Sequence, residues 1–195
     1  MKLGLSLLAV AGIAAAAAAQ NTLTYSWSVG DTGDNDGVIE PGEAALLVLR
    51  GTMAPSATGF AGSIYEILGG ANWTTGTVSS FTNHLKALTD DGDLQGNGDI
   101  KNIESFQLPP LFNPQFDASN PIKLYSITWT PANYTARSVS VSDANHQNND
   151  VYVDTFGSSV PYTGIAGSAT FNVVPTPASL ALLGLGGLVA GRRRR

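Results

Sequence analysis

Thr22-Leu23-Thr24-Tyr25-Ser26-Trp27-Ser28-Val29 is an unbroken alternation of polar and apolar side chains. Successive side chains of a β-strand point to opposite faces, so this stretch has one apolar face and one face of hydroxyl groups. A strand of this kind buries its apolar face against a second layer and turns the other face to solvent. The stretch therefore predicts a strand at the surface of a layered β domain.

The same two-residue period recurs along the chain. In Leu124–Thr130 it places Tyr125, Ile127 and Trp129 on one side. Other strand-like segments, separated by turn-forming Gly, Pro, Asn and Asp, are 44–49, 60–68, 73–81, 138–142, 151–154 and 166–174. We expect one short helix at Thr82–Leu88. Eight or so short strands joined by polar loops predict an all-β fold, an antiparallel β-sandwich that is either Ig-like or a jelly-roll.

The 195 residues divide into two end segments and one domain, residues 20–174. The domain holds all fifteen acids but only five of the ten cations, since Lys2 and Arg192–Arg195 lie in the end segments. Five cations against fifteen acids give the domain a net charge of −10, which repels nucleic acid and attracts cations. The chain has no cysteine, which excludes disulfides, thiolate catalysis and cysteine zinc sites.

The first nineteen residues have the organisation of a secretory signal peptide. Lys2 is followed by an apolar run from Leu3 to Ala19, which ends in the small residues that a signal peptidase requires. We expect cleavage between Ala19 and Gln20. The alternative is an N-terminal membrane helix that is retained.

The last residues, 175–195, combine a short motif, an apolar stretch and a basic end. The apolar stretch from Ala178 to Gly191 has 14 residues. As a helix it would span ~21 Å, less than the ~30 Å core of a bilayer. Arginines at the end of an apolar stretch favour the cytoplasmic side. The motif and basic end comprise Pro175, Thr176, Pro177, Ala178, Ser179, Arg192, Arg193, Arg194 and Arg195.

This tail resembles a PEP-CTERM sorting signal, with Pro175 and Pro177 at the two proline positions and Thr176 where the signal usually has Glu. The resemblance implies an exported bacterial protein that is anchored transiently in the inner membrane through a short C-terminal helix. It also implies processing by a membrane protease of the exosortase type, in addition to signal peptidase. The alternatives are a plain membrane anchor and a basic tail that binds nucleic acid.

Two acidic loops are candidate calcium sites, because calcium prefers six to eight hard oxygen ligands and alternate Asp side chains in a tight loop converge. The candidate ligands are Asp31, Asp34, Asp36 and Glu43 in the first loop, and Asp93, Asn97, Asp99 and Glu104 in the second. The first loop also resembles the Asp-rich, Pro-Gly-Glu-containing loops of bacterial extracellular β-sandwich modules. The alternative is a solvated loop of Asx turns. We interpret Asp143–Asp154 as a polar hairpin loop.

The sequence predicts no catalytic residues. Its acids cluster in glycine-rich turns, which suits a metal better than a carboxylate pair, and Glu66 and Glu104 are the best remaining catalytic candidates. Trp27, Trp73 and Trp129 are either core residues or a platform that stacks on sugars. We expect a non-enzymatic protein of the cell surface or extracellular matrix, stabilised by calcium. The alternatives are a carbohydrate-binding module for exopolysaccharide and a secreted hydrolase.

Overall fold

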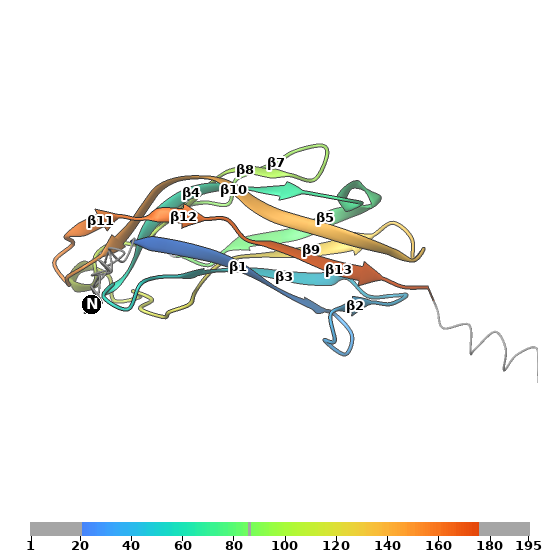
Figure 1. The fold of residues 1–195 in the computed structure, drawn as a ribbon, viewed down its shortest axis with the longest axis horizontal. Coiled ribbons are helices and arrows are strands. Elements are labelled where there is room, and N and C mark those ends of the chain that lie inside the picture. Colours follow the sequence, from blue (N-terminus) through green and yellow to red (C-terminus); the bar gives the residue numbers. More distant parts are fainter. Residues whose placement is uncertain (1–20, 86, 176–195) are drawn as a thin grey trace, which may run out of the picture.

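The computed structural model describes residues 21–85 and 87–175. In these residues the chain forms thirteen β-strands, arranged as two sheets, and two single-turn 3-10 helices (Figure 1). The predicted all-β sandwich is confirmed. The predicted signal peptide and the sorting tail after Pro175 lie outside the described residues.

The smaller sheet has five strands in the order β12-β1-β3-β9-β5. Its strands are antiparallel except for the parallel pair of β1 and β12. The alternating stretch at the start of the domain is β1, and it pairs with β3 from Thr24 opposite Thr52 to Asp31 opposite Ala45. The bounds are β1 Thr22–Asp31, β3 Ala45–Thr52, β5 Gly76–Asn83, β9 Ile122–Pro131 and β12 Thr163–Ile165.

The larger sheet has eight strands and follows the order β2-β13-β10-β4-β8-β6, with β11 paired to β10 and β7 paired to β8. The pair of β13 and β2 is parallel. The bounds are β2 Val38–Ile39, β4 Gly59–Gly69, β6 Ala87–Asp90, β7 Asp93–Leu94, β8 Ile100–Phe106, β10 Arg137–Tyr152, β11 Ser159–Pro161 and β13 Ser168–Val173. The 3-10 helices are η1, Trp73–Thr75, and η2, Pro110–Phe112.

The core lies between the sheets and is built from the inward side chains of the alternating strands. On β9, Leu124, Ile127 and Trp129 are buried, and Tyr25 of β1 lies in the same cluster. Burial of such a side chain contributes roughly 1.5–3 kcal/mol to the free energy of unfolding. Burial of the inward apolar faces, which the period of two creates, is therefore the main source of the fold's stability. Trp129 stacks on Trp73 with the ring centroids 5.8 Å apart.

Two of the sequence predictions are wrong. No helix forms at Thr82–Leu88: β5 continues to Asn83, and β6 begins at Ala87. The segment predicted as a polar hairpin loop, Asp143–Asp154, lies for most of its length in the 16-residue strand β10. Its register against β4 shifts between Ala144 and Gln147 and again before Asp150. Bulges insert extra residues and break the apolar alternation, so a bulged strand looks like a loop in the sequence.

Most strands lie along the long axis of the molecule, and the loops gather at its two ends (Figure 1). The C-terminal end carries the end of β13, β2 and the loop that joins β1 to β2. The opposite end, which we call the distal end, carries β11 and the turn that joins it to β10.

Candidate functional site

The first acidic loop is organised by the last residue of β1. Asp31 is only 3% exposed, and its Oδ1 accepts hydrogen bonds from the backbone N–H groups of Gly33 and Asn35, each at 2.8 Å. Its Oδ2 accepts a third from Gly37, also at 2.8 Å. The bond from Gly37, together with the other two, lowers the pKa of Asp31, although its burial acts in the opposite direction. Asp31 therefore fixes the backbone of the loop as an anionic acceptor.

Two further acids stand beside Asp31. Asp34 and Asp36 are exposed, and one carboxylate oxygen of each lies within 4.8 Å of the other and of an oxygen of Asp31. Glu43, the fourth predicted ligand, is not in this group: its Oε2 accepts the Glu40 N–H at 2.9 Å. Three of the four residues predicted for the first loop are therefore brought together, and they offer three of the six to eight oxygens that calcium takes.

In the second acidic loop most of the predicted ligands make hydrogen bonds within the protein, and the acids among them do not converge on one point. Asp93 accepts a hydrogen bond from the Asn102 amide at 3.0 Å. Asn97 donates to Asp99 at 2.8 Å, and the other oxygen of Asp99 accepts the Gly69 N–H at 2.8 Å. Glu104 is an exposed residue of β8. In residues 21–85 and 87–175 the acids of this loop do not form a second group of three. Instead, Asp99 fastens the loop to β4 and Asp93 fastens it to β8.

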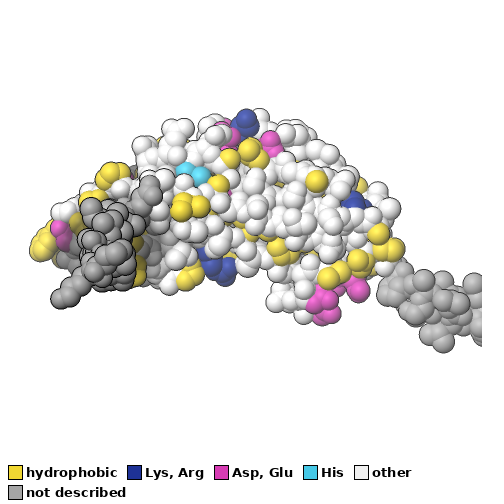
Figure 2. Space-filling model, viewed as in Figure 1, with side chains coloured by type: hydrophobic (Ala, Val, Ile, Leu, Met, Phe, Trp, Pro, Cys, Tyr) yellow, Lys and Arg dark blue, Asp and Glu magenta, His cyan; other side chains and the backbone are white. Residues whose placement is uncertain are grey.

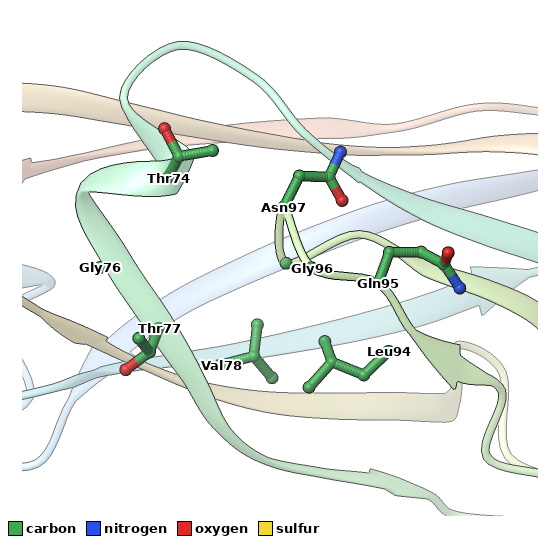
Figure 3. A pocket seen from close by; sticks show the side chains of 9 residues that line it. Thr74, Gly76, Thr77, Val78, Leu94, Gln95, Gly96 and Asn97 are labelled. Atoms are coloured by element: carbon green, nitrogen blue, oxygen red, sulfur yellow. The ribbon is translucent and has the colours of Figure 1, made fainter.

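A cavity of about 230 Å³ opens beside this second loop. Its walls are the first residues of β5 and the turn after β7 (Figure 3). The lining offers hydroxyl groups of Thr74 and Thr77 and the amide side chains of Gln95 and Asn97, with Leu94 and Val78 as apolar contacts. The turn is held in place because the indole N–H of Trp73 donates to the Gly98 carbonyl at 3.0 Å.

The three tryptophans do not form an exposed platform. Trp73 and Trp129 are 2% and 0% exposed, and Trp27 is partly buried against the core. They are core residues, as one of the two interpretations of the sequence predicted. The catalytic candidates Glu66 and Glu104 lie on the outer face of the larger sheet, on the neighbouring strands β4 and β8.

The sequence analysis missed a buried polar network that joins the two sheets. The Asp143 side chain of β10 is fully buried, and its Oδ1 accepts the indole N–H of Trp27 at 2.8 Å. The Gly167 N–H donates to both oxygens of this carboxylate, at 3.0 Å to Oδ2 and 3.1 Å to Oδ1. Oδ2 also pairs with Nε2 of His146 at 2.7 Å. The His146 ring stacks on Tyr25 at 3.9 Å. The only signal in the sequence was the Asp143-x-x-His146 spacing inside a polar run, which is common in solvated loops.

Tyr25 continues this network toward the distal half of the core. Its hydroxyl lies 2.7 Å from Ser63 Oγ and 2.8 Å from Asn149 Oδ1, and Ser63 also donates to Asn149 at 2.7 Å. Burial raises the pKa of Tyr25 well above its ordinary value, so this phenol stays protonated and donates. The network satisfies buried polar groups and therefore contributes to stability rather than to an exposed site.

The fold defines a class: a two-sheet, predominantly antiparallel β-sandwich whose loops gather at its two ends. Cohesin modules are among the solved structures that are similar to it. The cohesin module of a family 33 glycoside hydrolase from Clostridium perfringens is 8% identical, with a TM-score of 0.53 over 80% of this chain and 99% of that module. The seventh type I cohesin of ScaB from Pseudobacteroides cellulosolvens is 10% identical, with a TM-score of 0.50 over 76% of this chain and 90% of that one.

A third similar structure comes from a type I cohesin–dockerin complex of Clostridium thermocellum. It is 9% identical, with a TM-score of 0.51 over 74% of this chain and 96% of that one. At these identities the likeness is one of fold. No protein-family profile and no curated protein matches the sequence. Within residues 21–85 and 87–175, neither helix has the length or apolar character needed to cross a membrane.

Proposed function

We propose that this chain is an exported, non-enzymatic β-sandwich module of the cell surface or extracellular matrix, which acts by binding a partner through its ends. The observation that carries the proposal is the cohesin-like fold, which extends over 80% of the chain and nearly the whole of the compared module. One of the similar cohesins was solved in complex with a dockerin, so this fold supports binding in at least that protein.

The proposed export and sorting of the protein depend on its two end segments, residues 1–19 and 175–195. We propose that signal peptidase removes residues 1–19 and that an exosortase-type membrane protease recognises the PEP-CTERM-like tail, 175–195. The position of the tail supports this proposal. The last strand ends at Val173, and the Val174 N–H donates to the Ile39 carbonyl at 3.0 Å. Pro175 is exposed beside a groove that is also lined by Pro41 and Tyr134, so the motif begins where the sandwich ends.

The test is cell fractionation followed by intact-mass measurement of the mature protein. The expected product begins near Gln20, lacks the arginine end and is recovered from the envelope or the medium. A matched pair of variants sharpens the test: replacing Arg192–Arg195 by alanine should block processing at the tail, whereas T176E, which restores the usual motif, should leave processing intact or improve it. A full-length chain that stays in the cytosol with Met1 attached would refute the assignment.

Calcium is a separate part of the proposal. We propose that the loop of Asp31, Asp34 and Asp36 holds Ca²⁺, supported by the convergence of three carboxylates within 4.8 Å. Each of these side chains also accepts a backbone hydrogen bond. Asp31 Oδ1 is used fully by two such bonds, but Asp31 Oδ2 and the oxygens of Asp34 and Asp36 each accept no more than one of the bonds named here, which leaves a lone pair for a cation. A divalent cation would offset the repulsion among the three carboxylates.

A carbohydrate-binding function is the second candidate, and the cavity between β5 and the turn after β7 favours it. Threonine hydroxyls and the amides of Gln95 and Asn97 are groups that bind sugar hydroxyls, and Leu94 offers an apolar contact. A glycan array that includes exopolysaccharide fragments tests this function. Binding that is lost in Q95A/N97A but kept in E104Q, an exposed change outside the cavity, would establish it. An array without bound glycans would exclude this candidate.

A further inference from the structure

The distal end of the sandwich exposes an unusually apolar surface. Of the eight large apolar side chains that are exposed in the described residues, five lie in the two loops at this end. They are Leu108 at 40%, Leu111 at 58%, Phe112 at 64%, Val153 at 44% and Phe156 at 72% exposed. We call these five residues the apolar end patch. Apolar side chains are visible at this end of the molecule in Figure 2.

The patch is one continuous surface because its two loops are joined. The Leu111 N–H donates to the Thr155 carbonyl at 3.1 Å, which links η2 to the turn after β10. The ring of Pro109 packs against Gly157, where an added Cβ would lie 2.7 Å from Pro109 Cγ. Gly157 has a φ of 110°, a conformation that favours glycine. The sequence separates these loops by about forty residues, and only the fold places them side by side.

The patch is also held rigidly before any partner arrives. Asp154 Oδ1 accepts the backbone N–H groups of Phe156, Gly157 and Ser158 at 2.9, 2.9 and 3.0 Å, which fixes the turn that carries Phe156. On the other loop the Phe112 N–H donates to the Pro109 carbonyl at 2.9 Å. A preformed surface loses little conformational entropy on binding, so its apolar area is used efficiently.

The charge of the domain and the position of its main acidic loop favour a second copy of the chain as the partner of the patch, over an anionic membrane or a sugar. The acidic loop with Asp31, Asp34 and Asp36 lies near β2, at the C-terminal end (Figures 1 and 2). In the loops of the patch, Asp117 and Asp154 each accept backbone N–H groups, which partly satisfies their charge. Two copies that meet at their distal ends would therefore keep their main acidic loops far apart. An anionic bilayer would be repelled by the net acidic domain, and a sugar would find few polar side chains in the patch.

The area of the patch matches a weak contact between two copies. Five side chains of these sizes and exposures present roughly 500 Å², since one aromatic side chain offers ~150–250 Å². That value lies within the ~300–600 Å² that is typical of the largest, often functional, patch on a monomer. Two patches packed together would bury ~1,000 Å², the lower limit for a specific interface. The expected complex is a reversible dimer with a dissociation constant in the micromolar range or weaker.

We propose that the apolar end patch binds the patch of a second copy of this chain, so that two sandwiches join end to end. Because β13 ends at the pole opposite the patch, the ends of the two β13 strands would lie at the two extremes of the dimer (Figure 1). The dimer itself does not depend on the sorting tail. Its consequence rests on the proposed function: copies attached through their tails to different surfaces would link those surfaces.

The chain lacks cysteine, so single-cysteine cross-linking tests the geometry directly on the full chain. Thr155 is exposed between the two loops of the patch, and Thr77 is an exposed residue of β5 outside the patch. With a short bis-maleimide at micromolar protein, T155C should give a covalent dimer and T77C should not. Asn21 lies beside β12, toward the distal end, so association through residues 1–20 would also favour T155C. The substitutions in the patch described next distinguish that association from a dimer formed through the patch.

Two added substitutions separate the patch from general aggregation. F112D/F156D in the T155C chain should reduce cross-linking at least tenfold, whereas L46D, a similar change at an exposed leucine outside the patch, should leave it unchanged. Sedimentation velocity of the processed protein should show a monomer–dimer equilibrium that F112D/F156D abolishes. A monomer at every concentration, equal cross-linking of T155C and T77C, or patch-dependent flotation of a monomer with lipid vesicles would overturn the proposal. Correct export of a monomer would leave the proposed function intact and reject the dimer alone.

Discussion

Replacing Asp143 by alanine should destabilise this protein more than any exposed acidic substitution, because Asp143 is the buried acceptor that connects the two sheets. Its side chain is 0% exposed and that of its partner His146 is 7% exposed. In D143A the indole N–H of Trp27 and the N–H of Gly167 lose their acceptor, and the imidazole loses its carboxylate partner. Breaking a buried pair by removing one member typically costs ~3–5 kcal/mol.

The free energy of unfolding lost in D143A corresponds to a measurable fall in the melting temperature. For a domain of about this size, 1 kcal/mol shifts the melting temperature by roughly 2–4 °C, so D143A should lower it by roughly 6–20 °C. D143N keeps one carbonyl acceptor for Trp27 but loses the charge. Since charge-assisted hydrogen bonds are about twice as strong as neutral ones, its cost should be intermediate. The matched control is E104Q on the exposed face of β8, which should stay within ~0.5 kcal/mol of the wild type.

The assay is urea unfolding followed by tryptophan fluorescence, with H146A and the D143A/H146A double variant completing a cycle. In residues 21–85 and 87–175, His146 Nδ1 is the one buried side-chain polar atom without a hydrogen-bond partner. We therefore expect His146 to act mainly through Asp143, and the double variant should be less destabilised than the sum of the two single variants. A D143A variant that loses less than ~1 kcal/mol would refute the reasoning that this network holds the sheets together.

Three other outcomes are expected. Millimolar Ca²⁺ should raise the melting temperature of the processed protein by several degrees, as expected for ~2–3 kcal/mol of linked binding, and D34N/D36N should remove the rise; identical melts in Ca²⁺ and EDTA would exclude a structural ion. Because the pKa of Asp31 lies below its ordinary value of 3.8, its contribution is present above that value and is lost as the pH falls through the lowered pKa, so the stability difference between wild type and D31N should close below about pH 4 in acid-unfolding curves, and a gap that persists at lower pH would contradict this assignment. G69A should cost ~1–3 kcal/mol in urea unfolding because its Cβ would overlap the buried indole of Trp73, whereas G96A, with open space around its Cα, should be nearly neutral, and equal effects of the two changes would argue against the packing at η1.

The strongly alternating segments were predictable because they carry their information locally. The stretches that became β1 and β9 show a period of two, and both lie in the sandwich with their apolar faces inward. Weaker segments were not predictable. Ile100–Phe106 has its large apolar side chains three residues apart, at Ile100, Ile103 and Phe106, so it lacks the period of two and is not among the predicted strands. Its strand character depends on pairing with β4, which no local pattern encodes.

The candidate sites show the same difference between residues that are close in the sequence and residues that only the fold brings together. The convergence of Asp31, Asp34 and Asp36 was predictable because the three residues share one tight turn, whereas Glu43 lies across the turn and depends on how the loop folds back. The sequence alone determined the all-β class, the acidic charge of the domain and the resemblance of its tail to a sorting signal, since each follows from residue type and spacing. Tertiary structure alone decided the buried pair of Asp143 and His146 and the apolar end patch. The bulged register of β10 buries Asp143 and His146, three residues apart, and Asp143 then contacts Trp27 and Gly167, which lie far away in the chain. The patch joins two loops about forty residues apart, which only the packing at one end brings into contact.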